Sequence, residues 1–275
     1  MTTRRVLPGF GLSLGYTLTY LSLLVLIPLA ACFLKASKLS WDDFWAVAGS
    51  PNAVAAYKLS FGASLGAAAI NVVLGVLLAW VLVRYEFPGK RFVDSLVDLP
   101  FALPTAVAGL VYSSLYVENG WLGRYLVPLG IELAYSRGAI VLVLTFVSLP
   151  FVVRTLQPVL ENMDREIEEA AQLLGATRWQ TFYRVILPSL RPAIITGFAL
   201  AFARALGEFG SVIFVSSNIP GKTQIAPMLI VEQLEQLKET GYNNAAAIAV
   251  VLLVFSFILL GIINLLERWS QRNYA

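Results

Sequence analysis

Arg204 and Glu208 lie four residues apart in a stretch of sequence that is otherwise apolar. Residues at this spacing share one face of an α-helix, so the guanidinium and the carboxylate can meet. A charge in an apolar environment is costly unless it is paired or faces a cavity. Two interpretations stay open: Arg204 lines or gates a path for an anion, or the two residues form an ion pair that only pins their helix to its neighbours.

A second interruption of apolar sequence contains Pro100, Pro104 and Thr105. Proline has no backbone N–H group, so prolines four residues apart leave backbone groups unpaired. Such groups are tolerated at membrane depth where they line a cavity or are buried in protein, and the start of a helix suits an anion. The stretch predicts either part of an anion path or a kink that only shapes packing.

Composition restricts the catalytic chemistry that is open to the chain. Its 275 residues include one cysteine and no histidine, which excludes the usual zinc sites, a disulfide framework and the nucleophiles activated by histidine. Gly221-Lys222-Thr223 resembles the end of a phosphate-binding loop, but that motif requires a glycine where Ser216 stands. We therefore expect no catalytic residue, no metal and no cofactor.

The elements that carry these residues are predicted to be membrane helices. The chain is 58% hydrophobic and 13% charged, whereas a soluble domain carries about 25% charged residues. Apolar stretches of roughly the 20 residues that a spanning helix needs occur at 10–34, 59–83, 96–117, 138–156, 192–215 and 245–266. We expect an all-α integral membrane protein with about six transmembrane helices.

Glycine spacing would permit close approach between some of these helices. Gly11 and Gly15 in the first stretch, and Gly62 and Gly66 in the second, follow the small-xxx-small pattern. This pattern allows helix backbones to come close, although sequences rich in glycine and alanine also produce it by chance.

The distribution of positive charge predicts the orientation. With the N-terminus in the cytoplasm, twelve of the 20 Lys and Arg residues fall on the inner side and seven on the outer side, as the positive-inside rule favours. Both termini are then cytoplasmic. Arg4 and Arg5 before the first apolar stretch resemble a signal peptide, and 29–32 resembles a lipoprotein processing site. Because the stretch is long enough to span and more membrane sequence follows, we expect an uncleaved first helix.

The same orientation places a long polar loop, 157–191, in the cytoplasm. Acidic residues cluster early in a helix-favouring run that ends at Gly175, where glycine suits a helix C-terminus. Thr177 is a candidate N-cap for a second helix, which is expected to run from Trp179 to Ile186 and to stop at Pro188. The loop is therefore predicted to form two short helices joined by a sharp turn.

Three aromatic residues of this second helix, Trp179, Phe182 and Tyr183, stand among charged residues. Exposed apolar groups in such a setting favour a docking surface for another protein. The alternative is that they pack on the helix ends of the chain itself.

The loop contains Glu169-Ala170-Ala171, Gly175 after three further residues, and Val185-Ile186-Leu187-Pro188 after nine more. This pattern resembles the EAA loop of binding-protein-dependent ABC importer permeases. The family prefers isoleucine where this chain has Val185. The resemblance implies that the loop inserts into a cleft of a separate ATPase subunit. Glu169 would meet a basic group there, Ala170 and Ala171 would permit close approach, and Gly175 would form the turn.

Further stretches extend the resemblance to T-type permease subunits of bacterial sulfate and thiosulfate importers: 4–10, 98–109, 150–160, 169–188 and 204–214. This resemblance implies a type I ABC transporter transmembrane domain at 59–266, which contains the coupling loop. An N-terminal transmembrane helix and first periplasmic loop at 1–58 would precede it, and a cytoplasmic tail at 267–275 would follow.

The resemblance also implies partners and a location. These are a second homologous permease subunit, two ATP-binding ATPase subunits and a periplasmic sulfate/thiosulfate-binding protein, assembled in the bacterial inner membrane. The chain itself would then be a transport subunit and not an enzyme. No block of basic residues with interleaved aromatics indicates a nucleic-acid partner.

Alternative functions remain open at this point. Molybdate and tungstate permeases share much of the same pattern. An anion secondary transporter would usually have more spans, arranged as internal repeats. If it were coupled to protons, it would also have several carboxylates within the membrane, whereas Glu208 is the only carboxylate deep in a predicted span. A purely structural membrane scaffold leaves the polar two-helix loop unexplained.

Overall fold

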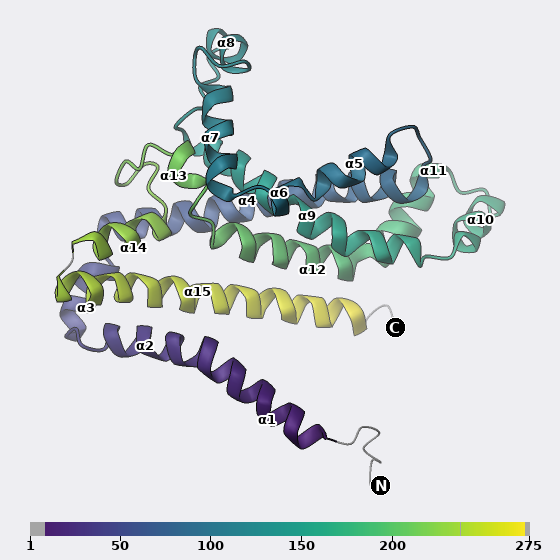
Figure 1. Ribbon diagram of the computed structural model, residues 1–275. Helices are drawn as coiled ribbons and strands as arrows, with labels where there is room; N and C mark the ends of the chain where they lie inside the picture. Colours follow the sequence, from purple (N-terminus) through teal and green to yellow (C-terminus); the bar gives the residue numbers. More distant parts are fainter. Residues whose placement is uncertain (1–8, 237, 273–275) are drawn as a thin grey trace.

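The computed structural model describes residues 9–236 and 238–272, and helices form most of this part of the chain (Figure 1). The main bundle consists of α4 (Pro51–Arg84), α9 (Arg137–Glu161), α12 (Leu187–Leu206) and α15 (Glu239–Arg272). One further long helix comprises α1 (Phe10–Leu21), a π-helical turn η1 (Ser22–Leu26) and α2 (Ile27–Ala36), and α2 packs on α15. The predicted class, an all-α membrane protein, is confirmed.

Shorter elements connect the long helices: α3 (Trp41–Ala48), α5 (Lys90–Val97), α6 (Leu99–Ala102), α7 (Thr105–Tyr116), α8 (Gly123–Leu126), the 3-10 turn η2 (Val127–Leu129), α10 (Arg165–Leu173), α11 (Arg178–Thr181), the π-helical turn η3 (Phe182–Ile186), α13 (Val212–Val215) and α14 (Ala226–Glu235). In Figure 1, α10 and α11 lie at the same end of the bundle as the start of α1 and the end of α15. The polar loop and both ends of the described chain are therefore on one side of the bundle.

Five helices of the described chain are long and apolar enough to cross a membrane: Phe10–Ala36, Pro51–Arg84, Arg137–Glu161, Arg178–Leu206 and Glu239–Trp269. Each overlaps one predicted stretch. The remaining stretch, 96–117, is divided among α5, α6 and α7. Leu103 and Pro104 are extended, with ψ of 133° and 130°, because a residue before proline disfavours the helical region and proline cannot continue a helix. In Figure 1, α7 stands away from the bundle.

The stretch predicted at 192–215 differs from the structure at both ends. On one side α12 ends at Leu206, and a short non-helical segment separates it from α13. On the other side the predicted stop at Pro188 is wrong, because the helix continues back to Arg178. The π-helical turn η3 precedes the proline, and the Leu187 N–H group donates to the Phe182 carbonyl, five residues earlier. The extra residue in this turn shifts the preceding carbonyls relative to the proline ring, so the helix is not interrupted.

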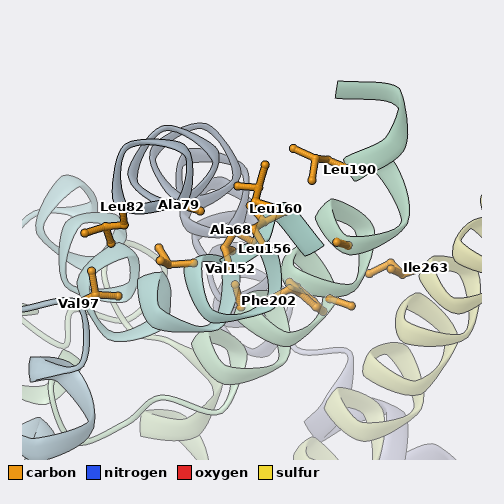
Figure 2. Close-up of a cluster of buried hydrophobic side chains, with 14 of the residues drawn as sticks. Ala68, Ala79, Leu82, Val97, Val152, Leu156, Leu160, Leu190, Phe202 and Ile263 are labelled. Carbon is orange, nitrogen blue, oxygen red and sulfur yellow. The ribbon is translucent and has the colours of Figure 1, made fainter. Parts of the chain in front are cut away.

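The helices α4, α9 and α12 meet around Val152, within a cluster of buried apolar side chains (Figure 2). A Cβ atom on Gly75 would lie 2.6 Å from Val152 Cγ1, and a Cβ atom on Gly197 would lie 3.2 Å from Val152 Cα. In lipid, close packing of this kind drives helix association, because the surrounding chains are as apolar as the helices. Glycine at these two positions therefore allows three helices to converge.

The glycines of the small-xxx-small pattern lie at no close contact between the described helices. Within the described chain, no neighbouring heavy atom would lie within 4 Å of a Cβ atom placed on Gly11, Gly15, Gly62 or Gly66. The pattern identifies glycines that share a helix face, but it does not identify the face on which a neighbour lies.

Replacing Gly75 by leucine should lower the stability of the bundle by about 1–3 kcal/mol, because the new side chain would collide with Val152 in a packed interior. Gly66→Leu is the matched control, since it adds the same side chain to the same helix in open space. Thermal unfolding of the purified chain in detergent measures the difference. Equal melting temperatures for the two variants would contradict the packing described here.

Candidate functional site

The first helix of the polar loop ends in the turn that the sequence predicts at Gly175. Gly175 has φ +83°, a left-handed conformation that favours glycine. Its N–H group donates to the Gln172 carbonyl at 2.9 Å, and the Ala176 N–H group donates to the Ala171 carbonyl at 3.0 Å. These two bonds form a Schellman motif, which satisfies the carbonyls at the end of α10.

The second helix of the loop begins at Thr177, also as predicted. The Gln180 N–H group donates to Thr177 Oγ1 at 3.3 Å, and the Thr177 N–H group donates to Gln180 Oε1 at 2.8 Å. This reciprocal pair is a capping box. Because α11 continues through η3 into α12, the loop is joined to a membrane helix without a flexible segment. A displacement of α11 would therefore be passed directly to α12.

The outer surface of the loop combines charge with apolar groups. Leu173 and Leu174 are each 89% exposed, and Trp179 and Tyr183 are 71% and 58% exposed. The two aromatic rings stack with centroids 5.8 Å apart. Phe182, in contrast, packs edge to face on Trp80 of α4 at 5.7 Å. The aromatics thus divide between the two interpretations: Phe182 packs on the chain itself, whereas the others form a surface that suits docking.

The residues of the EAA resemblance lie at and behind this surface. Glu169, Ala170 and Gly175 are exposed, and Ala171 is half-buried. Leu187 and Pro188 are half-buried at the start of α12. We define the coupling patch as the exposed residues Glu169, Ala170, Leu173, Leu174, Gly175, Trp179 and Tyr183.

The predicted Arg204–Glu208 pair is present at the end of α12. Glu208 Oε2 accepts a hydrogen bond from Arg204 Nη1 at 2.5 Å. Glu208 Oε1 accepts bonds from the N–H group and the hydroxyl of Ser211, each at 2.9 Å. Glu208 is 3% exposed, so these three bonds stabilise a buried carboxylate. They also close the non-helical segment between α12 and α13.

Arg204 is less enclosed than its partner. The Arg204 side chain is 30% exposed, against 2% for Glu208. Within the described chain, its hydrogen bond to Glu208 uses one of the five N–H donors of a guanidinium. Arg204 therefore has the capacity to contact an anion while it stays paired with Glu208.

The structure brings Thr105 close to this pair. A Cβ atom on Gly210 would lie 2.4 Å from Thr105 Oγ1, and one on Gly109 would lie 2.3 Å from the Ser211 carbonyl oxygen. The start of α7, with Pro104 at its N-cap, thus packs on the segment that Glu208 closes. Pro100 is placed differently, because it is buried in α6, which packs on α9.

An ionic network centred on Arg154 of α9 holds the divided segment, and no local sequence pattern predicts it. Arg154 Nε donates to Asp98 Oδ1 at 2.8 Å, and Arg154 Nη1 donates to Asp94 Oδ1 at 2.7 Å and to Gln157 Oε1 at 2.6 Å. Burial raises the pKa of Asp94, but hydrogen bonds from Arg154 and Gln157 and the charges of Arg154 and Lys90 lower it by more. The pKa of Asp94 therefore lies below its usual value, and the carboxylate stays charged at neutral pH.

Arg154→Ala should release α5 and α6 from α9 and lower the free energy of unfolding by about 1–2 kcal/mol, since charged hydrogen bonds of a partly exposed residue are lost. Arg91→Ala removes an exposed arginine from the same region and should change stability little. Thermal unfolding in detergent compares the two variants. A melting temperature for Arg154→Ala equal to that of Arg91→Ala would show that the network does not hold the segment.

The described residues contain no group of three or more His, Cys, Asp or Glu residues that could hold a metal ion. The chemistry of both regions is instead that of ion pairs, helix termini and apolar contact. Such groups suit binding and the transmission of movement.

Comparison with known proteins gives three findings. The family model described as "Binding-protein-dependent transport system inner membrane component" matches residues 71–272. The sulfate transport system permease protein CysT of Synechocystis sp. is 52% identical over 256 residues, covering 93% of this chain and 88% of that protein. The protein of the same name from Escherichia coli is 48% identical over 273 residues, covering 99% of this chain and 98% of that protein.

A solved structure is also similar. It is a bacterial alginate ABC transporter in complex with an alginate pentasaccharide-bound periplasmic protein, and one of its chains superposes with a TM-score of 0.77. The alignment covers 93% of this chain and 92% of that chain at 19% identity. At this identity the likeness supports the fold alone.

Proposed function

Because the chain belongs to the family of binding-protein-dependent transport system inner membrane components, we propose that it is the membrane-spanning permease subunit of an ATP-driven importer. The observation that carries the coupling part of this proposal is the joined helix from Arg178 to Leu206. It links the coupling patch to the segment that contains Arg204 and Glu208. A movement imposed at the patch would thus reach the middle of the bundle through one rigid element.

The substrate that we propose is sulfate, with thiosulfate as a related anion. Two relatives named as sulfate transport permeases are 52% and 48% identical over nearly the whole chain. The guanidinium of Arg204, which is partly exposed beside the buried Glu208, suits a tetrahedral oxyanion. Molybdate and tungstate share this geometry and charge, so they are the competitors that a transport assay must include.

We propose the following assembly and orientation. A second permease would complete the pathway, two ATPase subunits would dock at the coupling patches, and a periplasmic sulfate/thiosulfate-binding protein would deliver the anion on the other side. Both termini would then be cytoplasmic in a bacterial inner membrane. ATP hydrolysis would take place on the separate subunits.

We propose the following roles for the residues at and behind the patch. Glu169 would contact a basic group of the ATPase, and Ala170 and Ala171 would allow close approach of α10. Gly175 would hold the angle between α10 and α11. Leu187 and Pro188 would form the transition from the patch to the membrane, with residues 59–266 as the transmembrane domain, 1–58 before it and 267–275 as the tail.

The pathway proposal assigns the anion contact to Arg204, with Glu208 as its anchor. Thr105 and Pro104 at the start of α7 would border the same passage, because they pack on the segment that Glu208 closes. Pro100 would contribute indirectly, by breaking the helix ahead of them.

Uptake of radiolabelled sulfate by bacterial cells deleted for this chain, and then complemented with it, tests the proposed function. We expect uptake to be lost in the deletion and rescued by the chain, with molybdate uptake unaffected. Unchanged sulfate uptake in a strain without a redundant system would reject sulfate as the substrate. Co-purification of the chain with its ATPase in detergent tests the coupling role independently, and a scaffold without a transport role would show neither result.

A further inference from the structure

The coupling loop has a second attachment, besides its continuity with α12. Arg84, at the end of α4, places Nη2 2.5 Å from Glu168 Oε1 of α10. The two side chains are 10% and 20% exposed, so this ion pair is far less hydrated than the surface pairs that contribute little to stability. The pair joins two elements that are 84 residues apart in sequence.

The guanidinium of Arg84 is itself held in place by aromatic residues. Its central carbon lies 5.7 Å from the centroid of the Trp80 ring, one helical turn earlier on α4. Trp80 in turn packs edge to face on Phe182 at 5.7 Å. The end of α4 therefore contacts both arms of the loop, with Arg84 on α10 and Trp80 on η3.

This attachment matters because α10 has little else to hold it. Glu166, Ile167, Glu169, Ala170, Gln172 and Leu173 of α10 are all exposed. Arg84 Nε is buried without a hydrogen-bond partner in the described chain, so Glu168 provides the opposite charge for a guanidinium that otherwise contacts the Trp80 ring. Loss of Glu168 would leave a desolvated, unpaired cation, and such a group favours rearrangement of its surroundings.

Glu168 and Glu169 are adjacent but differ in their surroundings. Successive residues of a helix point about 100° apart. Glu168 faces α4 through Arg84, whereas Glu169 is exposed on the coupling patch. A force applied to the outer face of α10 would therefore reach α4 through the inner face of the same helical turn.

We propose that Arg84 is a positioning residue for coupling: by holding Glu168, it makes α4 a second lever, beside α12, that moves with the coupling loop. This inference rests on the proposed permease function. Two attachments fix the position of α10 relative to both α4 and α12, whereas the Gly175 turn alone joins α10 only to the helix that continues into α12. Closure of the ATPase subunits would then displace α4 and α12 together as one rigid body, and this movement would change the pathway between the two permeases.

The test uses three variants: Arg84→Gln, Glu168→Gln, and a double variant that exchanges the two charges, in which Arg84→Glu is combined with Glu168→Arg. Two variants are the matched controls. Lys90→Gln breaks an ion pair with the exposed Glu86, and Glu166→Gln removes the charge of an exposed acidic residue of α10. Each variant is assembled with the second permease, the ATPase and the binding protein in proteoliposomes. The readouts are co-purification of the ATPase, hydrogen exchange of 165–174, and sulfate transported per ATP hydrolysed.

In both single variants we expect the backbone amide hydrogens of 165–174 to exchange about tenfold faster than in the wild type. Both should also transport roughly tenfold less sulfate per ATP hydrolysed, while the ATPase still co-purifies. The charge exchange should restore most of both values, and the controls should match the wild type. Single variants that couple like the wild type, or a charge exchange that restores nothing, would overturn the proposal. If the single variants do not fold, Arg84→Lys and the charge exchange carry the test, and both must then fold and couple.

The two proposals fail in different ways. If the wild-type chain does not co-purify with an ATPase, the permease function is wrong, and hydrogen exchange of 165–174 still reports whether Arg84 holds α10. If the wild-type chain couples normally and the Arg84 variants do as well, only the second lever is wrong.

Discussion

Glu169→Lys combined with Gly175→Pro should abolish co-purification of the ATPase with this chain. Gly175 has φ +83° and donates its N–H group to Gln172. Proline fixes φ near −65° and has no N–H group, so it is incompatible with this turn at a cost of about 3 kcal/mol or more. The change redirects α10, and lysine reverses the charge that is proposed to meet the ATPase.

Gly130→Pro is the matched control for the turn. Gly130 also has a left-handed φ, +78°, and donates its N–H group to Val127, but it lies outside the coupling loop. We expect this variant to retain the ATPase in detergent. If the loop variant co-purifies as well as the control does, the coupling patch is not the docking site.

Arg204→Ala should abolish sulfate uptake while the complex still assembles. Glu208 keeps its two bonds from Ser211 in this variant, so the segment between α12 and α13 retains its closure. The lost contact to the anion is worth about 1.5–3 kcal/mol, which corresponds to a roughly 10- to 100-fold fall in uptake. Radiolabelled sulfate uptake and size-exclusion chromatography of the complex measure the two effects separately.

The double variant Arg204→Ala with Glu208→Ala distinguishes the two interpretations of the pair. It removes both charges, so a purely structural pair would tolerate it better than the single change does. If Arg204 contacts the anion, the double variant stays inactive. Recovery of uptake in the double variant, or failure of Arg204→Ala to assemble, would identify the pair as a structural pin.

Local chemistry made the coupling loop predictable from the sequence. The turn at Gly175 and the cap at Thr177 depend on residues within a few positions of each other, and both are present with the expected hydrogen bonds. The four-residue spacing that predicts contact between Arg204 and Glu208 is equally local, and the contact is present although α12 ends at Leu206 and Glu208 lies in the non-helical segment after it. In each case the interacting residues are close in sequence, so their contact can be predicted without knowledge of the tertiary packing.

Features that depend on tertiary packing could not be predicted in the same way. The partner of Arg84 is 84 residues away. The carboxylate partners of Arg154 are Asp94 in α5 and Asp98 between α5 and α6, 60 and 56 residues away. Nothing near Arg84 or Arg154 distinguishes them from other arginines at a membrane boundary. Their roles become visible only when α4, α9 and α10 are placed side by side.

The π-helical turn before Pro188 shows a second limit of sequence reasoning. Proline favours a helix break, and the prediction of a stop followed from that preference. The structure retains the helix because one additional residue in η3 accommodates the ring. This difference changes the functional interpretation, since a break at Pro188 would have separated the coupling patch from α12.

Reconstitution gives the most direct test of the central claim that this chain is the permease of an ATP-driven sulfate importer. Proteoliposomes containing the chain, its second permease and the ATPase, with ATP inside and loaded sulfate-binding protein outside, should accumulate radiolabelled sulfate, and excess molybdate should not compete. Accumulation that does not depend on ATP would contradict the claim and favour a secondary transporter. Absence of accumulation despite ATP hydrolysis stimulated by the binding protein would show that sulfate is not the transported anion.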